Sequence, residues 1–269
     1  MRRFLVLSAG IGLVTLLFGS FQASAQPSLG TAASFAVLGS STVTNTGATT
    51  VTGNLGVAPG SAITGFPPGI VVGGSIHAAD ATALQAQSDA ATAYTFLAGQ
   101  PCGTNLTGQD LGGKTLAPGI YCFSTSAQLT GTLTLDAQNN PNAVFIFQTG
   151  STITTASTSL VRVINGGLNC NVFWAVGSSA TLGSTTTFVG NILAVASVTL
   201  NTGANVNGRA IAQNGAVTLD ANNVNASASA CPGSAPAPPS TVPTLNFAGL
   251  GILVILLSAA AVLVLNRSS

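Results

Sequence analysis

The chain has very few charged side chains. Only 4% of its 269 residues are Asp, Glu, Lys or Arg, and none of the acidic ones is glutamate; an ordinary soluble domain has about 25%. The formal net charge is +1 and no basic cluster is present, so the chain cannot neutralise phosphates and nucleic acid is excluded as a partner. A disordered chain is excluded as well, because 46% of the residues are hydrophobic.

Catalytic groups are equally scarce. Hydrolases and lyases need clustered carboxylates or basic groups. The single histidine, His77, has no evident catalytic partner, and no Cys-x-x-Cys pair suggests a metal. We therefore predict that the protein is not an enzyme and that it needs no cofactor and no metal. Outside residues 75–99, the charged residues of the central region are thinly scattered: Asp110, Asp136, Asp220, Lys114, Arg162 and Arg209.

What the chain does have is a repeated phrase. Thr-Leu pairs that begin at Thr181, Thr199 and Thr218 each open a similar segment, with a period of 18 to 19 residues. Such a period is typical of a solenoid, in which one coil cannot bury its apolar side without its neighbours. Between the pairs, bulky and small polar residues alternate, which places one row inside and a Thr/Ser row outside.

One segment breaks this pattern. Residues 75–99 are rich in alanine, and Leu84, Ala91, Tyr94 and Leu97 lie near helical spacing. With Ser75 as a cap and Gly99 as a stop, we predict a helix over about 76–98 that packs along the coils.

Both ends carry targeting signals. Arg2 and Arg3, the apolar run that follows and Ala23-Ser24-Ala25 predict a signal peptide over 1–25. A single solenoid domain would then cover 26–231, followed by a Pro/Ser/Ala linker over 232–243 and a sorting or membrane segment over 244–269. The run from Phe247 to Leu265 is uncharged and long enough to span a bilayer. We expect an exported protein, held at the cell surface or membrane or released after processing of the tail.

The tail has a family likeness of its own. Val242-Pro243-Thr244-Leu245, the apolar run and Arg267 resemble the bacterial C-terminal sorting tails of the IPTL type, although valine replaces isoleucine. That resemblance implies a sorting protease as a partner, besides the membrane.

Four cysteines fall in the exported part. In an oxidising compartment an even number favours disulfides, and of the three connectivities we favour Cys102–Cys122 and Cys170–Cys231.

Two columns of hydroxyl and amide residues emerge when the repeated phrases are aligned. We predict that both columns lie outside on one face. The first is Thr46, Thr155, Ser184 and Thr202, and the second is Thr49, Thr158, Thr187 and Asn205.

Several long phrases then carry a family resemblance. LGTAASFAVLGSSTVTNTGATTVTGNLGVAPG, DLGGKTLAPGIY, AVFIFQTGSTIT, NVFWAVGSSATLGSTTTFVGNILA and LNTGANVNGRAIAQNGAVTLD occur in the order found in the DUF3494-type ice-binding domain. The likeness covers about residues 28–225. It implies a mainly β fold, a right-handed three-faced β-solenoid with one helix alongside, in which the first coils dock beside the last. Some relatives carry a T-A/G-x-T/N pattern on their ice-binding face, and residues 46–49, 155–158 and 202–205 match it, whereas 184–187 departs from it.

The physical properties agree with that resemblance. Stacked coils repeat at about 4.8 Å, a spacing compatible with the oxygen repeats of ice, and threonine is stiff at χ1. We therefore expect a monomeric protein whose partner is an ice crystal surface. The alternative is a structural or adhesive surface protein without affinity for ice, since Thr and Asn also suit solenoid turns.

Overall fold

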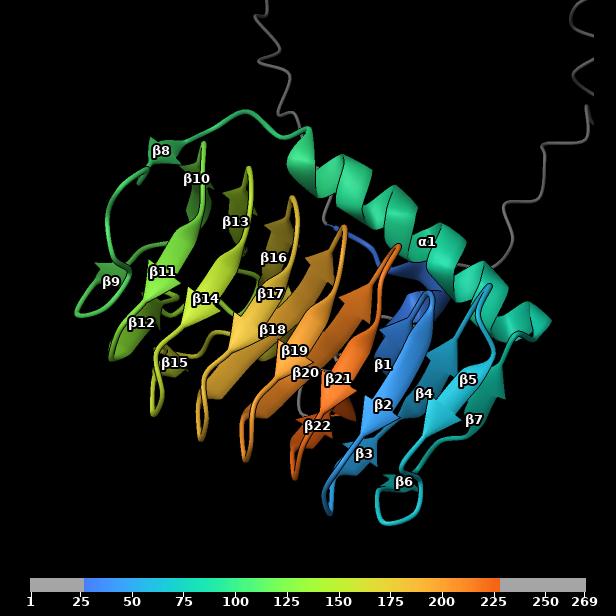
Figure 1. Cartoon of the computed structure of the whole chain (residues 1–269). Coiled ribbons are helices and arrows are strands. Elements are labelled where there is room, and N and C mark those ends of the chain that lie inside the picture. Colours follow the sequence, from blue (N-terminus) through green and yellow to red (C-terminus); the bar gives the residue numbers. More distant parts are fainter. Residues whose placement is uncertain (1–26, 228–269) are drawn as a thin grey trace, which may run out of the picture.

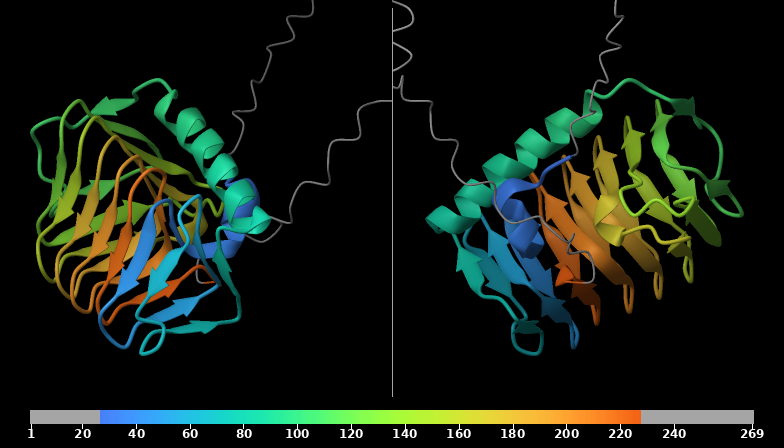
Figure 2. Two further views of the ribbon diagram at one scale, coloured as in Figure 1. Left: turned by 45° about the vertical axis from the view of Figure 1, so that its right-hand side comes forward. Right: turned by 180° about the vertical axis from the view of Figure 1, so that it is seen from behind.

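The computed structural model describes residues 27–227 as one three-sided solenoid of parallel strands with a helix lying along it (Figure 1). Each complete coil contributes one strand to each side. Two short 3₁₀ helices, η1 (Gly30–Ser34) and η2 (Asn169–Asn171), precede strands of the third side. The left view of Figure 2 looks obliquely along the stack of coils, and the right view shows the stack from behind.

The first face is a separate seven-stranded sheet. In spatial order its strands are β11 (Ala127–Leu129), β14 (Ile153–Thr155), β17 (Ala180–Leu182), β19 (Val198–Leu200), β21 (Val217–Leu219), β2 (Thr42–Asn45) and β5 (Ala62–Thr64).

The other two faces form one continuous sheet because β18 (Thr187–Ala194) and β20 (Asn205–Ala212) bend from one face into the next. The second face has the first halves of these two strands with β9 (Thr115–Leu116), β12 (Thr132–Asp136), β15 (Leu160–Ile164), β22 (Asn223–Asn225), β3 (Thr50–Thr52) and β6 (Ile70–Val72). The third has their second halves with β8 (Thr104–Asn105), β10 (Gly119–Phe123), β13 (Phe145–Thr149), β16 (Val172–Val176), β1 (Phe35–Gly39), β4 (Asn54–Val57) and β7 (Ile76–Ala78).

The order of the coils in space differs from their order in the chain. The last coil stacks on the first: β20 pairs with β1, β21 with β2 and β22 with β3, all in parallel. We call this junction the seam. The predicted docking of the first coils beside the last is confirmed.

Aromatic rings fill the middle of the core. Tyr121, Phe147 and Trp174 occupy equivalent positions of β10, β13 and β16. The Phe147 and Trp174 rings stack with centroids 3.9 Å apart, and the Trp174 ring also contacts Phe188 at 4.8 Å. The indole Nε1 of Trp174 donates to the carbonyl of Val189 at 3.0 Å, so its polar group is satisfied inside the core.

Helix α1 (Ala81–Ala98) ends where predicted but begins later. Asp80, not Ser75, is its N-cap and accepts from the amide of Ala83 at 2.8 Å. Residues 76–78 form β7 instead, because they pair with β4. Leu84 and Ala91 lie on the exposed side. The buried side is mostly alanine, which allows close packing on the third face: Ala83, Ala86, Ala90, Ala93 and Leu97.

A disulfide joins Cys102, just after α1, to Cys122 in β10, as predicted. No cysteine within residues 27–227 is free. Cys231, the predicted partner of Cys170, lies outside the described residues.

Removing this disulfide should weaken the fold measurably. The bond closes a loop across a sequence separation of 20, so the double variant Cys102→Ser/Cys122→Ser is expected to lose about 3 kcal/mol of unfolding free energy. Denaturant titration of both proteins measures this, and thiol titration of the unaltered, unfolded protein should find no free thiol. An unchanged midpoint would contradict the expected constraint.

The terminal signals lie outside the described residues: the predicted signal peptide, the linker and the sorting or membrane segment. Within residues 27–227, no helix has the length and apolar character needed to cross a bilayer.

Candidate functional site

The outer side of the first face carries two regular columns of small, uncharged residues. We call this surface the Thr face. Its first column runs across all seven strands, with each residue paired in register to the next: Gln128, Thr154, Thr181, Thr199, Thr218, Thr44 and Thr64. The second column lies two residues earlier in each coil: Ser126, Thr152, Ser179, Ser197, Ala216, Thr42 and Ala62.

The sequence builds this face by alternation. Between the two columns lies a residue that points inward, such as Val198, Val217 or Ile153, all fully buried. Because side chains alternate across a strand, the residues on either side of it must point outward. The apolar core therefore fixes the plane on which the hydroxyls and methyls stand.

The central threonines of this face present their hydroxyls to solvent. Within the described residues, no protein hydrogen bond engages the Oγ1 of Thr154, Thr181 or Thr199, whereas Thr152 donates to the Oγ of Ser126 at 2.9 Å. A free hydroxyl can both donate and accept, and the adjacent methyl group is rigid. The face can therefore hold water molecules at fixed, repeated positions.

Spacing across the Thr face follows from sheet geometry. Neighbouring strands lie about 4.8 Å apart, and residues two apart along a strand are separated by about 6.6 Å. The result is a nearly rectangular grid without an ionisable group. One carboxylate, that of Asp220, borders the face at the turn after β21, where it accepts from the hydroxyl of Thr202 at 2.5 Å.

The two predicted columns lie at the corner that joins the Thr face to the second face. Thr46, Thr158, Ser184 and Thr202 are turn residues at this corner. Thr187 and Asn205 begin β18 and β20 on the second face and are paired with each other. These six are at least partly exposed, beside the Thr face and not within it.

The other two predicted residues do not reach the surface. Thr155 is 3% exposed and Thr49 is fully buried. Their hydroxyls bond to Thr186 Oγ1 at 2.9 Å and to Asn45 Oδ1 at 2.6 Å. The register between β14 and β17 places Thr155 beside Leu182, which is two residues before Ser184. Thr155 and Ser184 are therefore not aligned in one column, contrary to the prediction. Because Thr155 and Thr49 are buried, direct contact of their side chains with a ligand is excluded in this fold.

Thr158 has a conformational role in its turn. Its φ is +60°, and the equivalent residues of the next coils also have positive φ: Thr185 (+57°), Gly203 (+72°) and Ala221 (+50°). The left-handed region is uncommon for β-branched residues. The hydroxyls of Thr158 and Thr185 turn back to the preceding carbonyl, at 2.6 and 2.7 Å.

A buried polar ladder holds the same corner together. The residue that points inward just before the second face is polar in four coils, Ser159, Thr186, Asn222 and Thr49, and is Ala204 in the coil between Thr186 and Asn222. Thr186 donates to the carbonyl of Ala156 in the preceding coil at 3.1 Å. At the seam, the amide of Asn222 donates to Thr49 Oγ1 at 3.0 Å. These bonds stabilise the edge of the Thr face from inside.

The signal for the Thr face was present in the sequence. Thr181, Thr199 and Thr218 are the threonines of the repeated Thr-Leu phrase, and each lies between two inward residues. The aligned phrases instead predicted the turn residues that follow these strands as the site.

Other features of the described chain offer less chemistry. His77 does have a partner, since its Nδ1 lies 2.7 Å from Asp80 Oδ2, but that carboxylate also caps α1. The hydrogen bonds that the Asp80 carboxylate makes with the amide of Ala83 and with His77 hold the pKa of Asp80 below its ordinary value. No group of three or more His, Cys, Asp or Glu within residues 27–227 could hold a metal.

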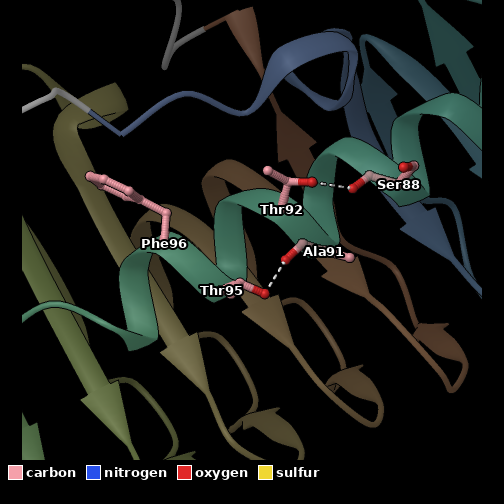
Figure 3. A pocket seen from close by; sticks show the side chains of 5 residues that line it. All are labelled: Ser88, Ala91, Thr92, Thr95 and Phe96. Carbon is pink, nitrogen blue, oxygen red and sulfur yellow. Dashed lines mark hydrogen bonds between the residues drawn. The ribbon is translucent and has the colours of Figure 1, made fainter.

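A shallow pocket on the outer side of α1 is lined by five uncharged residues, Ser88, Ala91, Thr92, Thr95 and Phe96 (Figure 3). Thr92 and Thr95 donate to carbonyls of their own helix, at 3.0 and 2.9 Å. Its hydroxyl groups are therefore mainly engaged within the helix.

Comparison with known proteins agrees with this geometry. The Ice-binding-like family model matches residues 37–225. An ice-binding protein of Nostoc sp. (strain HG1) is 57% identical over 218 residues, which cover 79% of this chain and 80% of the relative. The chain therefore belongs to the Ice-binding-like family.

Solved structures show the same relationship. The ice-binding protein of the Antarctic ascomycete Antarctomyces psychrotrophicus matches with a TM-score of 0.73 and 39% identity, covering 75% of this chain and 98% of that one. An ice-binding protein from an Antarctic biological consortium matches with a TM-score of 0.72 and 44% identity, covering 74% and 90%.

Proposed function

We propose that the protein binds ice through the Thr face and thereby inhibits ice growth and recrystallisation. The observation that carries this is the two-column grid, in register over seven strands and free of ionisable groups. Charged side chains would hold their own hydration shells, whereas hydroxyls and methyls let water take lattice positions. A rigid array also loses little conformational entropy on adsorption. Adsorbed molecules make the ice front curve between them, which lowers the local freezing point.

In this proposal, the exposed corner residues border the Thr face and do not form its centre. Thr46, Thr158, Ser184, Thr202, Thr187 and Asn205 would meet ice only at its margin. Three positions of the Thr face lack a hydroxyl: Gln128 and Ala62 on its end strands, and Ala216 just before β21. The first column, which is threonine on every strand from β14 to β5, therefore carries most of the binding.

The family likeness also supports three further parts of the proposal. We propose that the solenoid is right-handed, that the protein is a monomer and that it has no catalytic activity. From the sequence signals we also propose export, followed by attachment at the cell surface or membrane through the C-terminal segment, with a sorting protease as a further partner.

Ice growth in the presence of the domain tests the function. Both core clusters lie within residues 27–227, so the chain 26–231 is expected to fold with its four cysteines. At micromolar concentration it should facet ice crystals, produce thermal hysteresis and slow recrystallisation. Growth indistinguishable from that in buffer would favour the structural or adhesive alternative.

A further inference from the structure

The chain enters and leaves the solenoid at one corner. Gly190 and Gly208 stack where β18 and β20 bend from the second face into the third. The register of β22 and β3 continues this column through Ala226 to Gly53, and the amide of Ala226 donates to the carbonyl of Thr52 at 3.0 Å. We call this column the exit corner. Residue 227, the last described residue, follows it immediately.

The N-terminal part reaches the same corner. A Cβ built on Gly53 would lie 3.2 Å from the Cβ of Ala226 and 3.3 Å from the carbonyl oxygen of Ser34, the residue just before β1. The side chain of Asn54 donates to the hydroxyl of Ser34 at 3.2 Å. Both ends of the described chain are therefore anchored within one small region.

A buried cation fixes this region. Arg209, which follows Gly208, is 6% exposed. Its Nε donates to the carbonyl of Ala33 at 2.9 Å and its Nη1 to Asn191 Oδ1 at 2.7 Å. Burial lowers the pKa of Arg209 to about 10, so the group remains protonated at neutral pH. The hydrogen bonds of Arg209 hold the carbonyl of Ala33 against the solenoid and fix the position of the exit corner.

The Thr face lies on the opposite side of the molecule. In a three-sided prism, the corner between the second and third faces is opposite the first face. In Figure 1 the strands of the first face lie toward the viewer, whereas the view from behind in Figure 2 brings η1 to the front. The last described residue, 227, therefore lies on the side of the domain away from the Thr face.

Resting on the proposed ice binding, we propose that this protein attaches a lipid bilayer to ice. The bilayer is reached through the C-terminal segment with the uncharged run Phe247–Leu265, and the ice crystal is bound by the Thr face. Because exit corner and Thr face are opposed, one molecule engages both surfaces at once. Many copies on one membrane would add their contacts, so that weak single contacts become firm attachment.

Vesicle capture by ice tests the proposal with the full chain. Dye-filled phosphatidylcholine vesicles carrying the full chain are exposed to a growing ice hemisphere. They should be enriched in the ice at least about tenfold over protein-free vesicles. The matched control is full-chain Thr199→Tyr in the same vesicles, which should stay in the liquid. Full chain that does not remain with the vesicles would overturn the bilayer as partner.

A second arm tests the geometry directly. Residues 26–231 with Ser227→Cys or Ala216→Cys are coupled to maleimide-bearing phosphatidylcholine vesicles, so that the tether leaves from the exit corner or from the Thr face. Vesicles coupled through position 227 should be captured, and those coupled through position 216 should not. If both uncoupled domains bind ice but the position 227 vesicles are not captured, the opposed geometry is wrong while the proposed function stands. If neither domain binds ice, the proposed function itself fails.

Discussion

Thr199→Tyr should lower thermal hysteresis by at least about fivefold while leaving the fold intact. Thr199 lies at the centre of the first column, between Thr181 and Thr218. A tyrosine there projects beyond the plane and separates its neighbours from the lattice, and short-range contacts weaken steeply with even a 1 Å gap. Nanolitre osmometry measures the hysteresis, and circular dichroism and thermal melting check the fold.

Matched substitutions elsewhere locate the site. Asn223→Tyr places the same ring on the exposed second face and should leave hysteresis nearly unchanged. Thr202→Tyr and Thr158→Tyr alter the corner, where we expect intermediate losses. If either corner variant loses more activity than Thr199→Tyr, the binding surface is centred on the turns and not on the Thr face.

Trp174→Ala should have the largest effect on stability. Trp174 is fully buried between the rings of Phe147 and Phe188. Removing the indole leaves a cavity and an unpaired carbonyl on Val189, at a cost of about 3–5 kcal/mol in unfolding free energy. For a domain of this size that corresponds to a fall in Tm of roughly 10 °C.

Trp174→Phe is the conservative control for this core position. It keeps a stacked ring and loses mainly the bond to Val189, so its cost should be about 1–2 kcal/mol. Denaturant unfolding separates the two variants. Near 0 °C both should keep normal hysteresis if they remain folded, because neither touches the Thr face. Equal stability of Trp174→Ala and the unaltered protein would show that the aromatic stack contributes little.

Local alternation in the sequence determined much of this protein. Inward and outward residues could be read from the Thr-Leu phrases because successive side chains in a strand point to opposite sides. The alanine-rich segment identified α1 and its end, and the lack of charge excluded whole classes of function. The start of α1 was harder, since residues 76–78 could join either the helix or a strand until pairing with β4 decided it.

The tertiary structure alone decided which threonines share a surface. Alternation fixes the side on which a residue lies but not its register with the next coil, and Thr155 therefore falls two residues from its assumed partner and turns inward. The seam is equally nonlocal: Thr44 and Thr218 lie side by side across a sequence separation of 174. Such contacts depend on how whole coils stack, since buried apolar surface is gained only when coils distant in the chain meet.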